Sequence, residues 1–339
     1  MKVLVTGGAG FIGSHACKAL RAAGHHPVVY DNLSTGHAHA VRWGPLEVGD
    51  IRDATRLGEV LGRHRPDLVV HFAARAYVGE SVRDPAGYYD VNVAGTLNLL
   101  RRMEAAGVDR IVFSSSCATY GTPGTLPIEE DTPQNPINPY GFTKLVGERM
   151  LAEFETAYGL RWVALRYFNA AGADPDGELG EEHEPETHAI PLAIEAALGR
   201  GRAFTLFGDD YDTPDGSAVR DYVHVSDLAD AHVRAADHLA AGGRSAACNL
   251  GTGAGVSVLE IVSAAEMATG RRVPLVRGPR RPGDPPALYA SADRARDLLG
   301  WRPKFTSIAE TVETAVRWHA GGLATSAPRR TDLSQGIGA

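Results

Sequence analysis

The run from Thr6 to Gly13 constrains the fold of this chain most strongly. It reads Thr-Gly-Gly-Ala-Gly-Phe-Ile-Gly and lies between an apolar strand pattern and a helical pattern. In such a motif one glycine turns the chain tightly, one lets the backbone approach a pyrophosphate, and one lets helix and strand pack closely. The helix N-terminus also favours phosphate through its free N–H groups and its dipole. We therefore predict a dinucleotide site at Gly7, Gly10 and Gly13, with a purely structural turn as the alternative.

The first half of the chain alternates short apolar runs with helical patterns. That alternation is typical of a parallel sheet covered by helices on both faces. We predict an α/β fold, a Rossmann-type doubly wound parallel sheet with a smaller mixed α/β substrate-binding domain. The expected strands are 2–5, 27–30, 68–72, 110–113 and 161–167, and the expected helices are about 12–23, 53–62, 89–106 and 140–158.

The pattern changes after Asn169, where a stretch rich in Gly, Asp, Glu and Pro predicts a surface loop at 172–187. Further helices or strands are expected at 190–198, 203–207, 225–239, 258–268 and 308–320. We predict a dinucleotide-binding domain at 1–170, to which segments around 220–250 return, and a mainly substrate-binding domain at 171–321. The polar, Gly- and Ser-containing residues 322–339 predict a disordered tail.

Net charge and hydropathy exclude two classes of partner. The formal net charge is -7 and the paired arginines are scattered, so the clustered basic face that nucleic acid requires is not expected. No apolar run approaches the roughly 20 residues of a membrane span, and no signal peptide precedes the first strand. We therefore expect a cytoplasmic protein.

The cysteines and histidines favour neither a disulfide framework nor a metal centre. Cys17, Cys117 and Cys248 are odd in number and far apart, which indicates reduced thiols. The 13 histidines show no familiar metal-ligand spacing, so no metal site is expected.

Asp31 indicates which dinucleotide is bound. It closes the second predicted strand, where a carboxylate accepts hydrogen bonds from the ribose hydroxyls of adenosine and repels a 2′-phosphate. NAD is therefore favoured over NADP. The alternative is an aspartate that only caps the next turn.

Tyr140 and Lys144 lie four residues apart, on one face of a predicted helix. A free tyrosine has a pKa near 10, and a neighbouring ammonium or a positive nicotinamide favours the phenolate that a base requires. Ser114 to Ser116 end a sheet strand, where α/β folds expose their ligand crevice. We predict Tyr140 as catalytic base and acid, with Lys144 and Ser116 assisting; a core aromatic is the alternative for Tyr140.

With these motifs in order, the chain resembles the extended short-chain dehydrogenase/reductases, and within them the UDP-hexose 4-epimerases. The resemblance covers about 320 residues, and its most specific segments are YFNAAGADPDGELGE and VRDYVHVSDLA. The matching segments are TGGAGFIGSH, YDNLSTG, GDIRD, HFAA, VGES, NVAGTLNLL, SSSCATYG, NPYGFTK, LRYFNAAGADPDGELGE, VRDYVHVSDLADAH and RRPGDPPAL.

The resemblance implies an isomerase that interconverts UDP-galactose and UDP-glucose. Tyr140 would take the proton of the sugar 4-hydroxyl while hydride passes from C4 to NAD⁺, and the 4-keto sugar would turn over before hydride returns. The implied cofactor contacts are Gly7, Gly10, Phe11, Ile12, Gly13, Asp31, Asn32, Asp50, Ile51, Phe72, Ala73, Ala74, Asn92, Ser114, Tyr140, Lys144 and Tyr167. The implied substrate contacts are Ser116, Tyr140, Asn169, His188, Phe207, Arg220, Tyr222, Arg281 and Asp284.

The chain departs from the family pattern at three positions. Ala76 stands where many members carry a lysine near the cofactor phosphates, with Arg75 beside it as a candidate substitute. His188 replaces an asparagine near the sugar. Leu288 occupies the position that limits the size of the sugar 2-substituent, which raises the hypothesis that N-acetylated sugars are also accepted.

Several alternatives stay open or are opposed. A 4-epimerase of UDP-pentoses or UDP-uronic acids stays open, as does a catalytically silent NAD-binding protein, although Tyr140 and Lys144 oppose the latter. A 4,6-dehydratase is disfavoured because residues 116–120 hold no acid, and Asp31 opposes an NADP-linked reductase. The resemblance also implies a homodimer formed through two long helices per subunit, one of them the Tyr140 helix.

Overall fold

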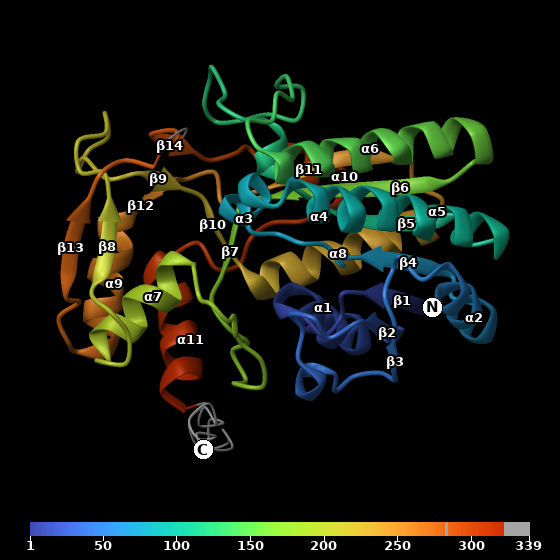
Figure 1. Cartoon of the computed structure of the whole chain (residues 1–339), viewed down its shortest axis with the longest axis horizontal. Coiled ribbons are helices and arrows are strands. Elements are labelled where there is room, and N and C mark those ends of the chain that lie inside the picture. Colours follow the sequence, from blue (N-terminus) through green and yellow to red (C-terminus); the bar gives the residue numbers. More distant parts are fainter. Residues whose placement is uncertain (282–283, 322–339) are drawn as a thin grey trace, which may run out of the picture.

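A seven-stranded parallel sheet forms the centre of the molecule (Figure 1). The computed structural model describes residues 1–281 and 284–321; the predicted tail at 322–339 lies outside the described residues. The strand order is β11-β6-β5-β4-β1-β2-β3, which confirms the predicted Rossmann-type fold. The strands are β1 (Lys2–Thr6), β2 (His26–Asp31), β3 (Leu46–Val48), β4 (Leu68–His71), β5 (Arg110–Ser116), β6 (Arg161–Tyr167) and β11 (Ala246–Leu250).

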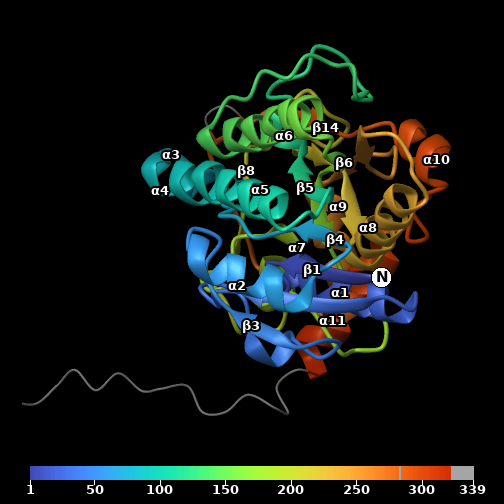
Figure 2. The same ribbon diagram turned by 90° about the vertical axis from the view of Figure 1, so that its right-hand side faces the viewer.

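Side chains of alternate residues on β1 point to opposite faces of the sheet, so they pack in two different hydrophobic cores. Val3 and Val5 pack with helices α1 and α8, whereas Leu4 packs with α2, α5 and α6. Figure 2 shows α5 and α6 on one side of the sheet and α8 and α10 on the other. These helices are α1 (Phe11–Ala22), α2 (Ala54–His64), α5 (Thr96–Ala105), α6 (Pro139–Tyr158), α8 (Val225–Ala240) and α10 (Asp293–Leu299).

A second group of elements lies to one side of the sheet, at the left of Figure 1. Helices α7, α9 and α11 share an apolar core, and the two-stranded sheet β8–β13 packs beside them. Two small sheets, β7–β10 and β12–β9–β14, complete it. The helices are α7 (Ala189–Ala197), α9 (Val258–Thr269) and α11 (Ile308–Gly321), and the strands are β7 (Asn169–Ala171), β8 (Phe204–Phe207), β9 (Val219–Arg220), β10 (Tyr222–His224), β12 (Val256–Ser257), β13 (Leu275–Gly278) and β14 (Ala287–Leu288).

The predicted helix at 89–106 is not a single regular helix. It begins as a π-helical segment, η2 (Tyr89–Gly95), and only then continues as α5. Two short helices absent from the prediction, α3 (Val78–Arg83) and α4 (Pro85–Tyr88), precede it. Isolated π-helical turns in α-helices are often found at functional sites, and this one carries Asn92.

Two negative expectations can be compared with the structure. Cys17, Cys117 and Cys248 are unpaired, as predicted. None of the helices within 1–281 and 284–321 combines the length and the hydropathy that a membrane crossing requires.

Candidate active site

The glycine loop between β1 and α1 has no room for side chains at two of its predicted glycines. Gly7 has a φ of +72°, and a Cβ there would lie 2.5 Å from the Ala73 backbone nitrogen. A Cβ at Gly13 would lie 2.2 Å from the Gly7 carbonyl oxygen. The backbone therefore requires glycine for its conformation and for close packing, as a pyrophosphate-binding turn does.

The N-terminus of α1 carries no side-chain cap at Gly10. Its first N–H groups, from Phe11 and Ile12 onward, are therefore the type of donor that binds phosphate. Beside it, Asp31 accepts hydrogen bonds from the Ala9 N–H (3.0 Å) and the Leu33 N–H (2.8 Å), one on each carboxylate oxygen. Burial raises the pKa of Asp31, and these two donors oppose the rise.

Asp31 therefore caps its own turn, which was the alternative interpretation, and it also remains suited to ribose. Each carboxylate oxygen retains a lone pair, and the side chain ends the strand next to the glycine loop. These residues fit a dinucleotide whose adenosine ribose carries free hydroxyls.

The other predicted cofactor residues lie at the carboxyl ends of neighbouring strands. Asn32 donates from Nδ2 to Asp50 (2.8 Å), and the Asn98 amide donates to the Ile51 carbonyl (2.6 Å). Both Phe72 and Ala73 donate their N–H groups to the Thr6 carbonyl. Because these ends are adjacent in a parallel sheet, segments distant in sequence meet at one crevice, where such folds bind ligands.

The side chain of Asn92 forms hydrogen bonds through both its carbonyl oxygen and its amide nitrogen. It accepts from the Arg75 N–H (2.8 Å) and donates to the Arg75 carbonyl (2.9 Å) and to Thr143 Oγ1 (3.0 Å). Its role as a direct cofactor ligand stays a prediction, while the structure shows it joining the 74–76 segment, which includes Ala74, to helix α6.

Arg75, the candidate substitute for the lysine missing at Ala76, already has two carboxylate partners. Its guanidinium binds Asp84 (2.6 Å) and Glu80 (2.7 Å) and lies over the Tyr88 ring. Those two carboxylates already neutralise its charge, so a contact with cofactor phosphates would first require breaking them.

Helix α6 brings Tyr140 close to the end of β5. Asn138 caps the helix by accepting from the Gly141 N–H (2.8 Å), and Pro139 occupies the first turn. A Cβ at Gly141 would lie 2.3 Å from the Ala118 carbonyl, and one at Gly147 would lie 2.5 Å from the Phe113 ring. The two glycines allow the helix to approach the strand at this distance.

Lys144 is buried one turn beyond Tyr140. Its Nζ donates to the Ser114 carbonyl (2.7 Å) and lies 5.8 Å from the Tyr140 ring centroid. Burial lowers the pKa of Lys144 to about 8, although the Glu148 carboxylate opposes this. At neutral pH the ammonium is still mostly protonated.

The expected effect of Lys144 on Tyr140 is not found in the protein alone. Removal from solvent raises the pKa of Tyr140 to about 12, and the Ser116 hydroxyl is what opposes that rise. The ammonium is directed at a backbone carbonyl rather than at the phenol. The phenol is therefore held neutral until further positive charge is present.

Ser114 and Ser116 have different roles. The Ser114 hydroxyl is in short contact with the Tyr167 hydroxyl, so these two predicted cofactor residues bind each other. Ser116 Oγ accepts from the Ala118 N–H (3.2 Å) and faces Tyr140. The structure thus brings Tyr140, Ser116 and Lys144 together at one strand end, as predicted.

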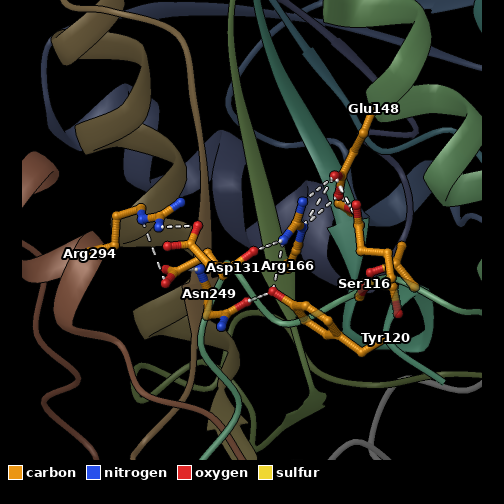
Figure 3. Close-up of polar contacts among 11 residues, drawn as sticks. Ser116, Tyr120, Asp131, Glu148, Arg166, Asn249 and Arg294 are labelled. Atoms are coloured by element: carbon orange, nitrogen blue, oxygen red, sulfur yellow. Dashed lines mark hydrogen bonds and ion pairs between the residues drawn. The ribbon is translucent and has the colours of Figure 1, made fainter. Parts of the chain in front are cut away.

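A buried polar network beneath these residues was missed from the sequence (Figure 3). Glu148, on the same α6 face as Tyr140 and Lys144, binds Arg166 through Nε (2.9 Å) and Nη2 (2.5 Å) and accepts from Ser115. Its only sequence signal was the continuation of the four-residue spacing along the helix.

The network extends from Arg166 across the sheet. Arg166 donates to the Tyr120 hydroxyl (2.8 Å), which donates in turn to Asn249 (2.7 Å) on β11 (Figure 3). Because Ser115 lies between Ser114 and Ser116, the network fixes the strand end that presents the acceptor for Lys144 and the hydroxyl beside Tyr140.

Four of the predicted substrate residues lie on the three small sheets: Asn169, Phe207, Arg220 and Tyr222. Asn169 on β7 is directly paired with Tyr222 on β10, and Leu288 on β14 is paired with Arg220 on β9. Arg220 is in short contact with Asp284.

The remaining substrate candidates are placed less tightly. The Arg281 guanidinium lies over the Phe207 ring at 4.2 Å, and both residues are exposed. His188 precedes α7 and is in short contact with Glu181. Burial lowers the pKa of His188, but the adjacent Glu181 and Glu186 outweigh it, and the net shift is upward.

Comparison with known proteins identifies the family. The model of the NAD dependent epimerase/dehydratase family matches residues 3–251. The chain belongs to that family. A UDP-glucose 4-epimerase of Rhizobium meliloti is 58% identical over 318 residues, which cover 94% of this chain and 97% of the relative.

Solved structures of family members have the same fold. A UDP-glucose 4-epimerase of Brucella ovis in complex with NAD has a TM-score of 0.92 and 56% identity, covering 94% of this chain and 98% of its own. One of Bifidobacterium longum in complex with NAD⁺ and UDP has a TM-score of 0.90 and 40% identity, covering 95% and 99%. The similarity to these UDP-glucose 4-epimerases therefore extends over nearly the whole chain.

Proposed function

We propose that this protein is an NAD-dependent UDP-glucose 4-epimerase, which interconverts UDP-galactose and UDP-glucose through a 4-keto sugar. The observation that carries the proposal is the meeting of Tyr140, Lys144 and Ser116 at the end of β5, in a chain that belongs to this epimerase family. Bound NAD supplies the acceptor and donor of hydride at sugar C4.

The chain's own residues move the proton. Tyr140 takes the proton of the sugar 4-hydroxyl and later returns it, while Ser116 positions that oxygen. Lys144 keeps a positive charge nearby and holds the Ser114 carbonyl. Burial raises the pKa of Tyr140, so the phenol is a poor base in the protein alone, and the positive charge of NAD⁺, when bound, would favour its deprotonation.

The substrate residues support recognition of a nucleoside diphosphate. Arg220 and Arg281 are the proposed phosphate ligands, because guanidinium matches phosphate geometry. Asp284 is proposed for the uridine ribose, and Asn169 for the diphosphate region. Phe207 and Tyr222 would line the uridine site, and His188 the sugar.

The first test is epimerisation of UDP-galactose by purified protein without added NAD, with UDP-glucose followed by chromatography. We expect product, since a reaction with no net redox change leaves the cofactor bound. Absence of product even after NAD is supplied would contradict the proposal and direct attention to UDP-pentoses and UDP-uronic acids as substrates.

The sugar specificity is a finer part of the proposal. Leu288 is paired in register with Arg220, a proposed phosphate ligand, and this supports a role for Leu288 at the substrate end of the site. A leucine is intermediate in size, and we propose that UDP-N-acetylhexosamines are also accepted. Turnover of both sugar classes by one preparation tests this, and no turnover of the N-acetylated sugars would remove the idea.

A homodimer in the cytoplasm completes the proposal. Exposed apolar side chains lie on α3, η2, α5 and α6, and two of them, Tyr89 and Phe142, make an edge-to-face contact at 6.3 Å. Burial of such side chains stabilises an interface. Light scattering should show twice the chain mass, and Phe142→Arg should give the monomer.

A further inference from the structure

The described part of the chain contains three groups of His, Asp and Glu side chains whose ligand atoms lie close enough to share one metal ion. Asp174, Asp176 and Glu178 already share a cation, because Lys18 Nζ lies 2.6–2.9 Å from all three. His37, His39 and Glu182 form a more exposed group. The third group lies between β7 and α7, and we name it the 181–188 cluster: Glu181, His183, Glu186 and His188.

The donor atoms of the 181–188 cluster have the spacing of metal ligands. His183 Nδ1 lies 3.1 Å from Glu181 Oε1 and 3.9 Å from Glu186 Oε2. His188 Nδ1 lies 3.5 Å from Glu186 Oε1 and contacts the same Glu181 oxygen as His183. Four ligands at zinc bond lengths stand about 3.3 Å apart in a tetrahedron, so small movements would make these atoms converge on one ion.

One donor atom in the cluster is poorly satisfied by its protein partner. His183 Nδ1 is buried and lies 3.1 Å from Glu181 Oε1, but this contact lacks the geometry of a hydrogen bond. The ring of His183 is held by edge-to-face contacts with Tyr77 (5.8 Å) and Phe11 (6.4 Å). A buried nitrogen without a well-aligned partner costs free energy, and a bound ion would remove that cost.

The two carboxylates of the cluster also have no permanently charged cation as a partner among the described residues. The Glu181 side chain is 4% exposed and that of Glu186 is 10% exposed. Among the described residues, their ion-pair partners within 4 Å are the two histidines, which carry charge only when protonated. Two buried carboxylates without a fixed cation favour a bound positive ion.

Backbone N–H groups orient one carboxylate of the cluster. Glu186 Oε1 accepts from the Thr187 N–H (2.6 Å) and the His188 N–H (2.8 Å). Two imidazoles with two carboxylates suit zinc and similar transition metals, whereas calcium and magnesium prefer oxygen ligands alone. We propose that the 181–188 cluster binds a divalent transition-metal ion of the zinc type.

The site has a structural rather than a redox role. It lies in the segment that packs on Phe11, beside the glycine loop, and on Tyr77. A bound ion would therefore fasten the 173–188 segment to the loop that is proposed to hold the cofactor. It would also engage His188, so metal and sugar are expected to compete for that side chain.

The test is a Co²⁺ titration of the full-length protein, prepared without a histidine tag and freed of metal with EDTA. We expect the visible d–d absorption of tetrahedral Co²⁺, saturating at one equivalent and removed by Zn²⁺. Glu181→Gln and His183→Gln should each weaken Co²⁺ binding by more than about 100-fold, because changes outside the ligand set alone cost about 10- to 100-fold.

The matched control is the double variant His37→Gln/His39→Gln, which alters the neighbouring exposed group and should leave the absorption unchanged. Circular dichroism checks that each variant is folded, and Glu186→Gln replaces any ligand variant that is not. Absence of the band at stoichiometric Co²⁺, or a band that survives both ligand substitutions, would overturn the proposal. The readout does not depend on epimerase activity.

Discussion

Two arginine–carboxylate pairs, one on each side of the site, differ in how many of their hydrogen-bonding groups have protein partners. Beneath the catalytic helix, Arg166 and Glu148 are 7% and 6% exposed and bind through several hydrogen bonds. On the substrate side, Arg220 and Asp284 are 13% and 27% exposed and share one short contact. The first pair is enclosed by protein partners, whereas the second retains hydrogen-bonding capacity for a ligand.

The difference indicates how each side of the site is built. The proposed catalytic groups lie on strand β5 and helix α6 and make buried contacts, so their geometry is formed before ligands bind. The proposed substrate groups lie on short strands and loops, and two of them, Arg220 and Asp284, neutralise each other in the protein alone. Four substitutions test this contrast.

The largest effect is expected for Tyr140→Phe on the catalytic side. Removing the hydroxyl eliminates the proton acceptor and donor, so kcat should fall by about 100- to 10,000-fold, the usual contribution of general acid–base catalysis. Turnover of UDP-galactose measures the effect, and retained bound NAD with an unchanged melting temperature is the control. A variant with near-normal kcat would show that another group moves the proton.

A large loss of stability is expected for Arg166→Met. The substitution leaves the buried Glu148 carboxylate without its partner, which typically costs about 3–5 kcal/mol. Urea denaturation measures the free energy of unfolding. Arg220→Met is the matched control and should cost less than Arg166→Met, because the Asp284 carboxylate keeps more contact with solvent than Glu148 does; equal losses in the two variants would remove the distinction between the pairs.

Arg220→Met is expected to weaken substrate binding without slowing the chemical step. A hydrogen bond to a charged group contributes about 1.5–3 kcal/mol, so KM for UDP-galactose should rise by about 10- to 100-fold while kcat changes little. Steady-state kinetics and UDP titration measure it. If kcat fell while KM stayed constant, Arg220 would belong to the catalytic side instead.

The smallest effect is a change in how stability depends on pH. Burial lowers the pKa of Lys144 from its ordinary 10.5 to about 8, so between these values the unfolded chain holds a proton that the folded chain has released. Stability contributed by this group therefore rises with pH across that window. The rise should disappear in Lys144→Met and remain in Lys304→Met, an exposed control, when urea unfolding is measured at several pH values.

The sequence was informative where the chemistry is local. The glycine loop, Asp31 and the Tyr140–Lys144 spacing each lie within one strand–helix unit or one helix, so their relative positions follow from regular geometry. The helix at 89–106 was less well predicted, because the extra residue in the η2 turn has no signal in hydrophobic periodicity. The same reasoning did not reveal how deeply Tyr140 is buried, and burial dominates the pKa of its phenol in the protein alone.

The sequence by itself determined the fold class and led to the proposed catalytic residues, because apolar patterning indicates the first and local spacing indicates the second. Tertiary structure decided the partners: Arg166 for Glu148, Asp284 for Arg220, and the convergence of the 181–188 cluster. These contacts join side chains that are distant in the sequence. The distances between them depend on how sheets, loops and helices pack, and the choice of partner depends on which buried charges still lack a counter-charge. Packing of this kind is a property of the whole chain, and no segment of the sequence specifies it alone.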